Sequence, residues 1–123
     1  MLGHARLMAF VSTSDPKRAL AFYGDTLGLQ LVEETPYALV FDVGGTTLRV
    51  TVAQQVVTAP YTVLGWTVDD IQATATALQQ AGIELQRFDN LDQDAHGIWT
   101  SPTGAQVIWF HDPDGNVLSA TQG

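Results

Sequence analysis

Apolar and polar residues alternate along two β-rich runs, and each run ends at an acidic residue that can begin a helix. Residues 7–14 lead into Asp15, and residues 62–69 lead into Asp70, with either Asp69 or Asp70 as the cap. Alternation with a period of two predicts strands, because successive side chains of a strand point to opposite faces. Asp is a favoured N-cap, since its carboxylate accepts a hydrogen bond from the first turn. The chain therefore begins the same strand-to-helix step twice.

Helical spacing follows each capping position. Apolar residues recur at intervals of three or four up to Gly28 in the first half and up to Gly82 in the second. Pro16 suits the first helical position, where its missing N–H would have no partner. Glycine readily takes the left-handed conformation that ends a helix. The predicted helical stripes are Leu20, Tyr23 and Leu27 in the first half, and Ile71, Ala75 and Leu78 in the second.

Three further strands are predicted after each helix. Gly44-Gly45 supplies a tight turn between the last two strands of the first half, and Asp112-Pro113-Asp114-Gly115 supplies one in the second. Residues 89–104 form a loop insertion with a short strand at 98–100, and a long loop of this kind beside a pocket is often a lid. The predicted strands are 29–34, 37–43 and 46–53, and then 83–88, 105–111 and 116–121.

The repeated unit predicts an α+β fold built from two βαβββ modules. A chain of 123 residues fits one domain of ordinary size. We therefore expect residues 1–123 to form a single domain that is duplicated internally, over about 5–53 and 61–121, with 54–60 as the link.

Alternation also separates the two faces of each strand. One face is apolar throughout and should lie under the helices. The other is mixed, and includes Met8 and Phe10 on the first strand, Arg49 and Thr51 on another, and Ser119 on the last. A mostly apolar surface with a few placed polar groups is typical of a ligand pocket. The alternation is equally compatible with a weakly polar sheet face that is exposed to solvent.

Composition excludes several classes of function. The chain has 13 Asp and Glu against 5 Lys and Arg, a formal net charge of −8. So few cations do not make the basic face of a nucleic-acid binder, and the negative charge disfavours binding to anionic membranes. No cysteine is present, which excludes disulfides and thiolate catalysis. The N-terminus has no signal-peptide pattern and no apolar run has the length of a membrane span, so we expect a cytoplasmic protein.

Three segments carry a resemblance to a known family. They are residues 14–28, the Val68-Asp69-Asp70 start of the second helix, and residues 109–116, which contain His-Asp-Pro-Asp-Gly-Asn. In order and spacing they resemble the vicinal oxygen chelate superfamily, which includes glyoxalase I, extradiol dioxygenases, and fosfomycin- and bleomycin-resistance proteins. The resemblance implies two βαβββ modules whose strands form a curled mixed sheet around a pocket.

Metal-dependent members of that family hold a metal with four side chains, usually His and Glu. The matching positions of this chain are Met8, Arg49, Val63 and Ser119. Met and Val offer no useful ligand to a hard cation, and Arg49 brings a positive charge to the position. The resemblance therefore implies a member of the metal-free type, with no metal and no cofactor. Such members bind a small molecule as homodimers.

Several side chains are candidates for contact with a ligand. Arg49 can anchor a carboxylate or phosphate, or can instead pair with one of the many acidic residues. Trp99 can stack on a flat ligand from the loop insertion, whereas Trp66 is expected in the core. The predicted ligand-binding residues are Arg49, Phe10, Met8, Ser119, Val63, Thr51 and Trp99.

Two histidines, His96 and His111, are the candidates for a general base. His111 adjoins a tight turn, where a structural role is favoured, and His96 lies in the loop insertion near Asp92 and Asp94. These loop residues make a weak metal signal.

Three functions follow, in order of preference. The first is metal-independent sequestration of an organic ligand. The second is a lyase or isomerase of the same superfamily that uses pocket residues such as Arg49 and a histidine instead of a metal. The third is an accessory module without a ligand. The sequence leaves open whether the protein is an enzyme.

Overall fold

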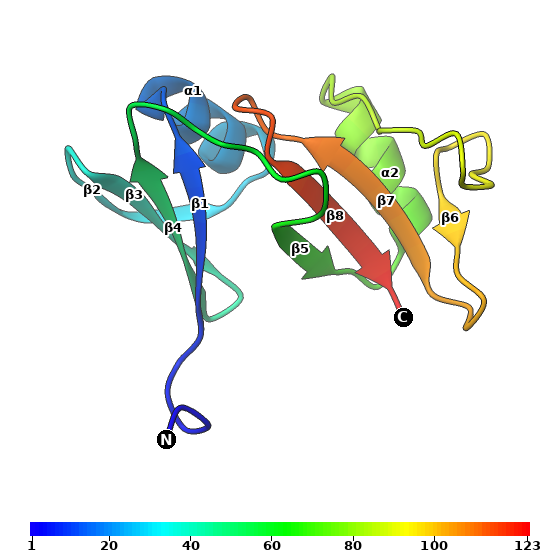
Figure 1. Cartoon of the computed structure of the whole chain (residues 1–123), viewed down its shortest axis with the longest axis horizontal. Helices are drawn as coiled ribbons and strands as arrows, with labels where there is room; N and C mark the ends of the chain where they lie inside the picture. Colours follow the sequence, from blue (N-terminus) through cyan, green and yellow to red (C-terminus); the bar gives the residue numbers. More distant parts are fainter. The chain divides into compact units, whose positions relative to one another are not determined.

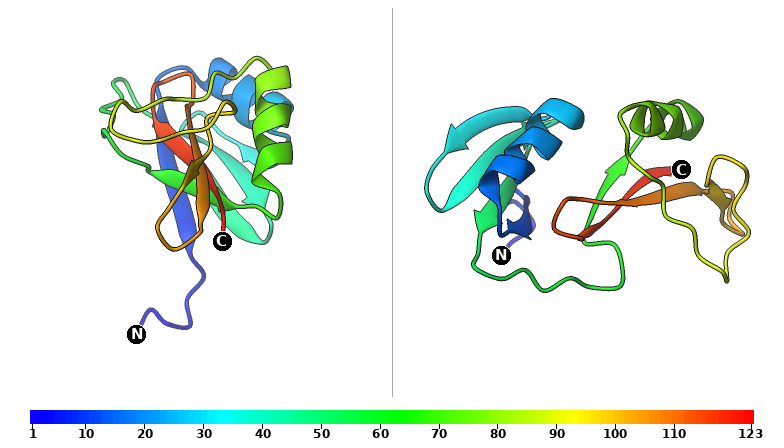
Figure 2. Two further views of the ribbon diagram at one scale, coloured as in Figure 1. Left: turned by 90° about the vertical axis from the view of Figure 1, so that its right-hand side faces the viewer. Right: turned by 90° about the horizontal axis from the view of Figure 1, so that it is seen from above.

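The computed structural model describes all residues, 1–123, and separates into two compact units. Unit 1 comprises Met1–Thr58, and unit 2 comprises Ala59–Gly123. Each unit holds one four-stranded sheet with helical structure on one face (Figures 1 and 2). The α+β class and the two βαβββ modules predicted from the repeat are therefore confirmed.

Sheet 1, the sheet of unit 1, has the strand order β1-β4-β3-β2. The pairing of β1 with β4 is parallel, and the other two pairings are antiparallel. The two-residue turn Gly44-Gly45 joins β3 to β4, and both glycines have positive φ, at 56° and 88°. Glycine takes this conformation without steric cost, as the turn requires. The strands are β1 Met8–Thr13, β2 Gln30–Glu34, β3 Ala38–Val43 and β4 Thr46–Val52.

The helical segment of unit 1 begins as predicted. Asp15 caps α1 (Pro16–Leu20), with its carboxylate accepting a hydrogen bond from the Arg18 N–H at 3.2 Å. The segment then widens into a π-helical turn, η1 (Ala21–Thr26), which the sequence pattern did not predict. It ends before Gly28, whose φ of 76° breaks the helical conformation.

Sheet 2, the sheet of unit 2, has the strand order β5-β8-β7-β6, with β5 parallel to β8. Asp70, rather than Asp69, caps α2 (Ile71–Gln80), because its carboxylate accepts a hydrogen bond from the Ala73 N–H at 3.1 Å. Gly82 follows with a φ of 86°. The strands are β5 Leu64–Thr67, β6 Trp99–Thr100, β7 Gln106–His111 and β8 Val117–Gln122.

The apolar face of each sheet lies under the helical segment of its own unit, as alternation predicted. In unit 1 the ring of Tyr23 packs near that of Phe41, with 6.1 Å between the centroids. In unit 2, α2 contacts β7 and β8, and Trp66 stacks on buried Phe110 at 6.3 Å. Burial of these side chains is the main source of stability. The buried sheet residues include Val11, Leu39, Phe41, Leu48 and Val50 in unit 1, and Ile108, Phe110, Leu118 and Ala120 in unit 2.

The prediction of a strand at 83–88 is wrong. This segment has no regular strand structure, although the Gln86 N–H donates to the Trp109 carbonyl at 2.8 Å. The predicted short strand at 98–100 is confirmed as β6, and it takes the place beside β7 that completes the module. The Gln93 side chain of the following loop bonds to the Gln86 carbonyl and the Phe88 N–H in place of a strand ladder.

Gln93 ties the loop insertion to that segment. Its Oε1 accepts from the Phe88 N–H at 2.8 Å, and its Nε2 donates to the carbonyls of Gln86 and Gly97, at 3.0 and 2.9 Å. Arg87 adds bonds from Nη2 to the carbonyls of Asp94 and Ala95, at 2.8 and 3.1 Å. A loop fixed by this many bonds is part of the framework of unit 2, so we do not interpret it as a lid.

Neither α1 nor α2 has the length and apolar character needed to cross a membrane.

Candidate functional site

The face of sheet 1 opposite the helical segment, called here open face 1, brings together four of the predicted ligand-binding residues. Phe10 on β1 is directly opposite Arg49 on β4, and Arg49 is in turn opposite Val40 on β3. Met8 lies two residues before Phe10, opposite Thr47. Directly opposite side chains in a sheet are close enough to contact the same small molecule.

The apolar side chains of open face 1 are unusually accessible. Phe10 is 57% exposed and Met8 is 46% exposed, whereas the helix-side Phe41 is fully buried. Arg49 is half-buried, and no hydrogen bond or ion pair engages its guanidinium within unit 1. The ion pair considered as the alternative role for Arg49 is therefore not formed in its own unit. A cation beside exposed apolar surface can recognise a carboxylate or phosphate.

Thr51 lies on the same open face, opposite Ser12 of β1 and Ala38 of β3. It is half-buried. Alternation along β4 therefore places a hydroxyl and a guanidinium on one surface, at Thr51 and Arg49.

The face of sheet 2 opposite α2 is called here open face 2. It holds Val63 and Ser119, the other two of the four positions that the resemblance matches to metal ligands. Ser119 on β8 lies between Gly65 on β5 and Trp109 on β7. Val63 precedes β5, and its N–H donates to the Val117 carbonyl at 3.0 Å. Val63 is exposed and Ser119 is buried. Ser119 therefore presents a hydroxyl in the middle of the sheet, and Val63 an apolar side chain at its border.

An aromatic cluster lies on open face 2. Trp109 contacts Phe88 edge to face at 5.2 Å between centroids, and Trp99 at 6.0 Å with a tilt of 42°. Two of the three rings come from segments that Gln93 holds in place, because Gln93 binds the Phe88 backbone and forms an isolated bridge with Trp99. Trp99, predicted to stack on a ligand, is half-buried and packs against Trp109.

Gln86, in the segment 83–88 beside β7, is a polar residue that sequence reasoning missed. Its Oε1 is buried and has no hydrogen-bond partner. Leu85, its neighbour in the chain, is buried.

Both candidate histidines, His96 and His111, belong to unit 2, whereas Arg49 belongs to unit 1. His96 is exposed, and its backbone N–H donates to the Asp94 carboxylate at 2.9 Å. Asp94 also accepts from the Ile98 N–H at 2.9 Å, so that its carboxylate shapes a loop. No group of three or more His, Cys, Asp or Glu side chains in the chain could hold a metal ion. Asp94 thus acts as a turn residue.

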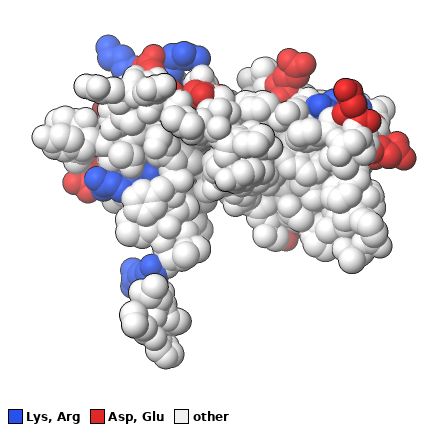
Figure 3. Space-filling view, viewed as in Figure 1, with Lys and Arg blue, Asp and Glu red and all other residues white.

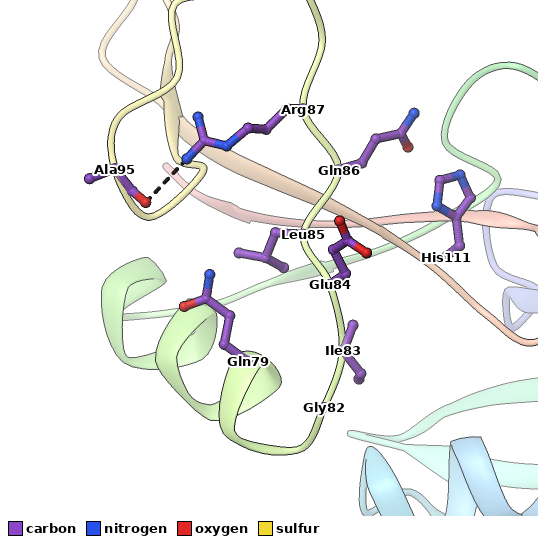
Figure 4. Close-up of a pocket in the computed structure, with 9 residues that line it drawn as sticks. All are labelled: Gln79, Gly82, Ile83, Glu84, Leu85, Gln86, Arg87, Ala95 and His111. Atoms are coloured by element: carbon purple, nitrogen blue, oxygen red, sulfur yellow. Dashed lines mark hydrogen bonds between the residues drawn. The ribbon is translucent and has the colours of Figure 1, made fainter.

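His111 lines a groove of about 950 Å³ in unit 2 (Figure 4). The groove follows residues 82–87, which include Glu84 and Gln86, and its lining also includes Gln79 and Ala95. In Figure 4, Leu85 and Gln86 leave the segment on opposite sides, and Arg87 reaches the carbonyl of Ala95. Because its guanidinium already donates to two carbonyls, Arg87 serves the loop rather than the groove.

The four positions that the resemblance matches to metal ligands hold side chains that are poor ligands for a divalent metal ion. Met8 and Val63 offer no oxygen or nitrogen ligand, and Arg49 is a cation. The Ser119 hydroxyl is the single oxygen in the set, and one neutral hydroxyl is a weak ligand.

Charge is divided unequally between the units. Unit 2 carries eight Asp and Glu and a single Arg, a formal net charge of −7, whereas unit 1 carries five acids and four Lys and Arg, a net −1. In the view of Figure 3, basic groups gather on unit 1 and acidic groups dominate the charged surface of unit 2. The positive charge of Arg49 on open face 1 is therefore part of a unit whose net charge is close to zero.

The order of the elements and the residues of the two open faces can be compared with known proteins. The sequence profile of the Glyoxalase/Bleomycin resistance protein/Dioxygenase superfamily matches residues 2–119, nearly the whole chain. The chain belongs to this superfamily. The resemblance read from residues 14–28 and 109–116 is thereby confirmed at the level of the superfamily. None of the curated proteins matches the chain.

Solved structures of superfamily members share the fold. Lactoylglutathione lyase from Agrobacterium tumefaciens is similar with a TM-score of 0.77 and 20% identity, over 98% of this chain and 94% of that one. A superfamily member from Sphaerobacter thermophilus DSM 20745 is similar with a TM-score of 0.75 and 19% identity, over 100% of both chains. The fosfomycin resistance protein FosX from Listeria monocytogenes gives 0.73 and 12%, over 95% and 91%. At these identities the likeness concerns the fold alone.

Proposed function

We propose that the protein binds and sequesters a small organic molecule at open face 1, without a metal ion. The observation that carries the proposal is the pairing of Phe10 with Arg49 across β1 and β4. An exposed aromatic ring there adjoins a guanidinium that has no partner within its unit. This combination supports a ligand with an apolar body and an anionic group.

Arg49 and Phe10 would contribute to the binding free energy in different ways. A guanidinium can donate two parallel hydrogen bonds to a carboxylate, which fixes the orientation of the ligand as well as its charge. Phe10 contributes area that is removed from water when the ligand binds, at about 25 cal/mol per Å². A bond between charged groups is worth about 1.5–3 kcal/mol. Loss of Arg49 should therefore weaken binding of an anionic ligand by roughly ten- to hundredfold.

The binding experiment compares 2-naphthoate with its neutral amide, 2-naphthamide, by isothermal titration calorimetry. Arg49→Met should weaken binding of the carboxylate at least tenfold and leave the amide unchanged, whereas Phe10→Ala should weaken both. Arg6→Met, in the exposed N-terminal segment, is the matched control. Equal carboxylate affinity in Arg49→Met and the parent protein, or no binding of either probe, would contradict the proposal.

Metal independence is tested separately by elemental analysis of the purified protein. We expect less than stoichiometric divalent metal and no change in the naphthoate affinity after chelation. One tightly held divalent ion per chain, lost in Ser119→Ala, would overturn this part of the proposal. The homodimer expected from the resemblance stays a prediction, which light scattering tests.

A further inference from the structure

A row of side chains crosses open face 1 and continues past Arg49 to the edge of sheet 1. Arg49 on β4 is opposite Val40 on β3, and Val40 is in turn opposite Glu33 on β2, the edge strand. Phe10 on β1 is opposite Arg49 on the other side. Directly opposite residues of a sheet share a face. The row therefore has an aromatic ring at one end, a carboxylate at the other, and a guanidinium beside the ring.

A β-bulge in β2 places Glu33 on the open face. On one side of the bulge, Leu31 is opposite Phe41. On the other side, Glu33 is opposite Val40, so that two steps along β2 match a single step along β3. In a regular strand Glu33 would share the helix-side face of Leu31, because residues two apart point the same way. Bulges re-aim side chains in this manner and are frequent beside active sites.

The two charged groups of the row are not paired with each other. Glu33 is exposed, and no hydrogen bond or ion pair engages its carboxylate within unit 1, as is also true of the Arg49 guanidinium. Half-buried Val40 occupies the strand between them. Neighbouring strands are about 4.8 Å apart, so roughly 10 Å separates the backbone at 33 from that at 49. A molecule with a rigid apolar body can place one charged end at each residue.

Asp42 is the other acid on open face 1, and its carboxylate has a structural role. It lies on β3 opposite Gln30 and Thr47, and its Oδ1 accepts a hydrogen bond from the Gly45 N–H at 3.1 Å. This bond belongs to the tight turn between β3 and β4. Glu33 is therefore the acid of this face whose two carboxylate oxygens are both available to a ligand.

The charges of the row select among anionic ligands. Arg49 attracts a carboxylate, whereas Glu33 repels it. A cationic group at the far end of the ligand turns that repulsion into attraction, and Phe10 and Val40 supply apolar contact on the two sides of Arg49. An exposed ion pair changes an equilibrium constant by up to about fivefold. The row therefore favours a zwitterion over a simple anion.

We propose that the ligand of open face 1 is a zwitterion with a rigid apolar body, whose anionic group binds Arg49 and whose amine, at the opposite end, binds Glu33. The inference rests on the proposed function and deepens it, because it keeps the contact with Arg49 and adds a second charged end.

Three naphthalene probes measure the preference in calorimetric titrations of the full chain. 6-(Aminomethyl)-2-naphthoate carries its charges at opposite ends. 6-(Hydroxymethyl)-2-naphthoate has a neutral group of similar shape in place of the amine, and 3-(aminomethyl)-2-naphthoate carries its charges side by side. We expect the first probe to bind about three- to fivefold more tightly than either of the others. Equal affinities for the first two probes, or for the two amines, would overturn the proposal.

Substitutions in β2 connect the preference to Glu33. Glu33→Gln should weaken binding of 6-(aminomethyl)-2-naphthoate and strengthen binding of the hydroxymethyl compound, whereas a folding defect would weaken both. Glu34→Gln is the matched control, because it removes the same charge from the next residue, which is opposite buried Leu39. An unchanged preference in Glu33→Gln, or an equal loss of preference in the two variants, would rule out the assigned contact.

Arg49→Met distinguishes failure of this inference from failure of the proposed function. It should weaken binding of both 6-substituted naphthoates at least tenfold, as expected for 2-naphthoate. Arg49-dependent binding without a preference for the amine would refute the zwitterion and leave the proposed function intact. Affinities that do not change in Arg49→Met, or no binding of any probe, would refute the anionic contact of the proposed function and the inference with it.

Discussion

Gly65 and Ser119 are opposite each other across the parallel strands β5 and β8, and a Cβ at position 65 would lie 3.1 Å from Ser119 Oγ. The same Cβ would lie 3.4 Å from the Ser119 carbonyl oxygen. The missing side chain at 65 thus leaves the space that the Ser119 hydroxyl occupies. The glycine is required by close approach rather than by an unusual φ.

Gly65→Ala should therefore be coupled to position 119. We expect the single substitution to destabilise the fold by about 1–2 kcal/mol, since small-to-large changes in packed sites force shifts. In a Ser119→Ala background the clash with Oγ disappears, and the cost of Gly65→Ala should fall by about 0.5–1 kcal/mol. Urea denaturation of the four proteins in the cycle measures the coupling. Strictly additive free energies would contradict the packing described for this pair.

Removal of Gln93 should loosen the framework of unit 2. Gln93→Ala leaves the Phe88 N–H and the carbonyls of Gln86 and Gly97 without their present partner. We expect a loss of about 2–4 kcal/mol in unfolding free energy, since several part-buried groups lose their bonds at once. Hydrogen exchange at the Phe88 amide should accelerate. Gln80→Ala, which is exposed, should change stability by less than about 0.5 kcal/mol, and a similarly small effect at Gln93 would refute the role.

The two aspartates before α2 should differ in their contribution to stability. Asp70→Ala removes the acceptor for the Ala73 N–H and should cost about 1 kcal/mol. Asp69→Ala removes a carboxylate that does not cap the helix, and should have a smaller effect. Thermal unfolding of the two variants compares acidic neighbours with the same change of charge. Equal destabilisation would show that charge rather than the capping bond is responsible.

The two faces of sheet 1 should respond differently to the same substitution. Phe41→Ala, at a fully buried position, should destabilise by about 3–5 kcal/mol. Phe10→Ala, at a position that is 57% exposed, should cost much less, roughly 1 kcal/mol or under. Denaturant unfolding gives both values. A large cost at Phe10 would mean that the ring belongs to the core, and would remove the main apolar contact of the proposed site.

Much of the fold was predictable because local patterns agreed with the final packing. Asp15 and Asp70 cap helices, Gly28 and Gly82 follow them with positive φ, and Gly44-Gly45 forms the turn between β3 and β4. Each depends on residues within one turn or one strand. The faces of the strands followed from the same short-range alternation.

The segment 83–88 shows where local reasoning fails. It alternates as a strand should, but Gln93 takes up the N–H of Phe88 and the carbonyl of Gln86. A side chain several residues further along the chain thus competes with the sheet for the same backbone groups. The unsatisfied Gln86 Oε1 is equally invisible in the sequence, because it depends on which donors the folded chain leaves within reach.

The partition into two units, each with its own helix-covered core, has a consequence for how such a chain can change over evolutionary time. Because each sheet packs its apolar side against its own helical segment, we expect residues of open face 1 and of open face 2 to tolerate replacement separately. A duplicated βαβββ module can therefore carry two surfaces of different chemistry. Here the near-neutral unit carries Arg49 on its open face, and the acidic unit carries Trp109 and Ser119.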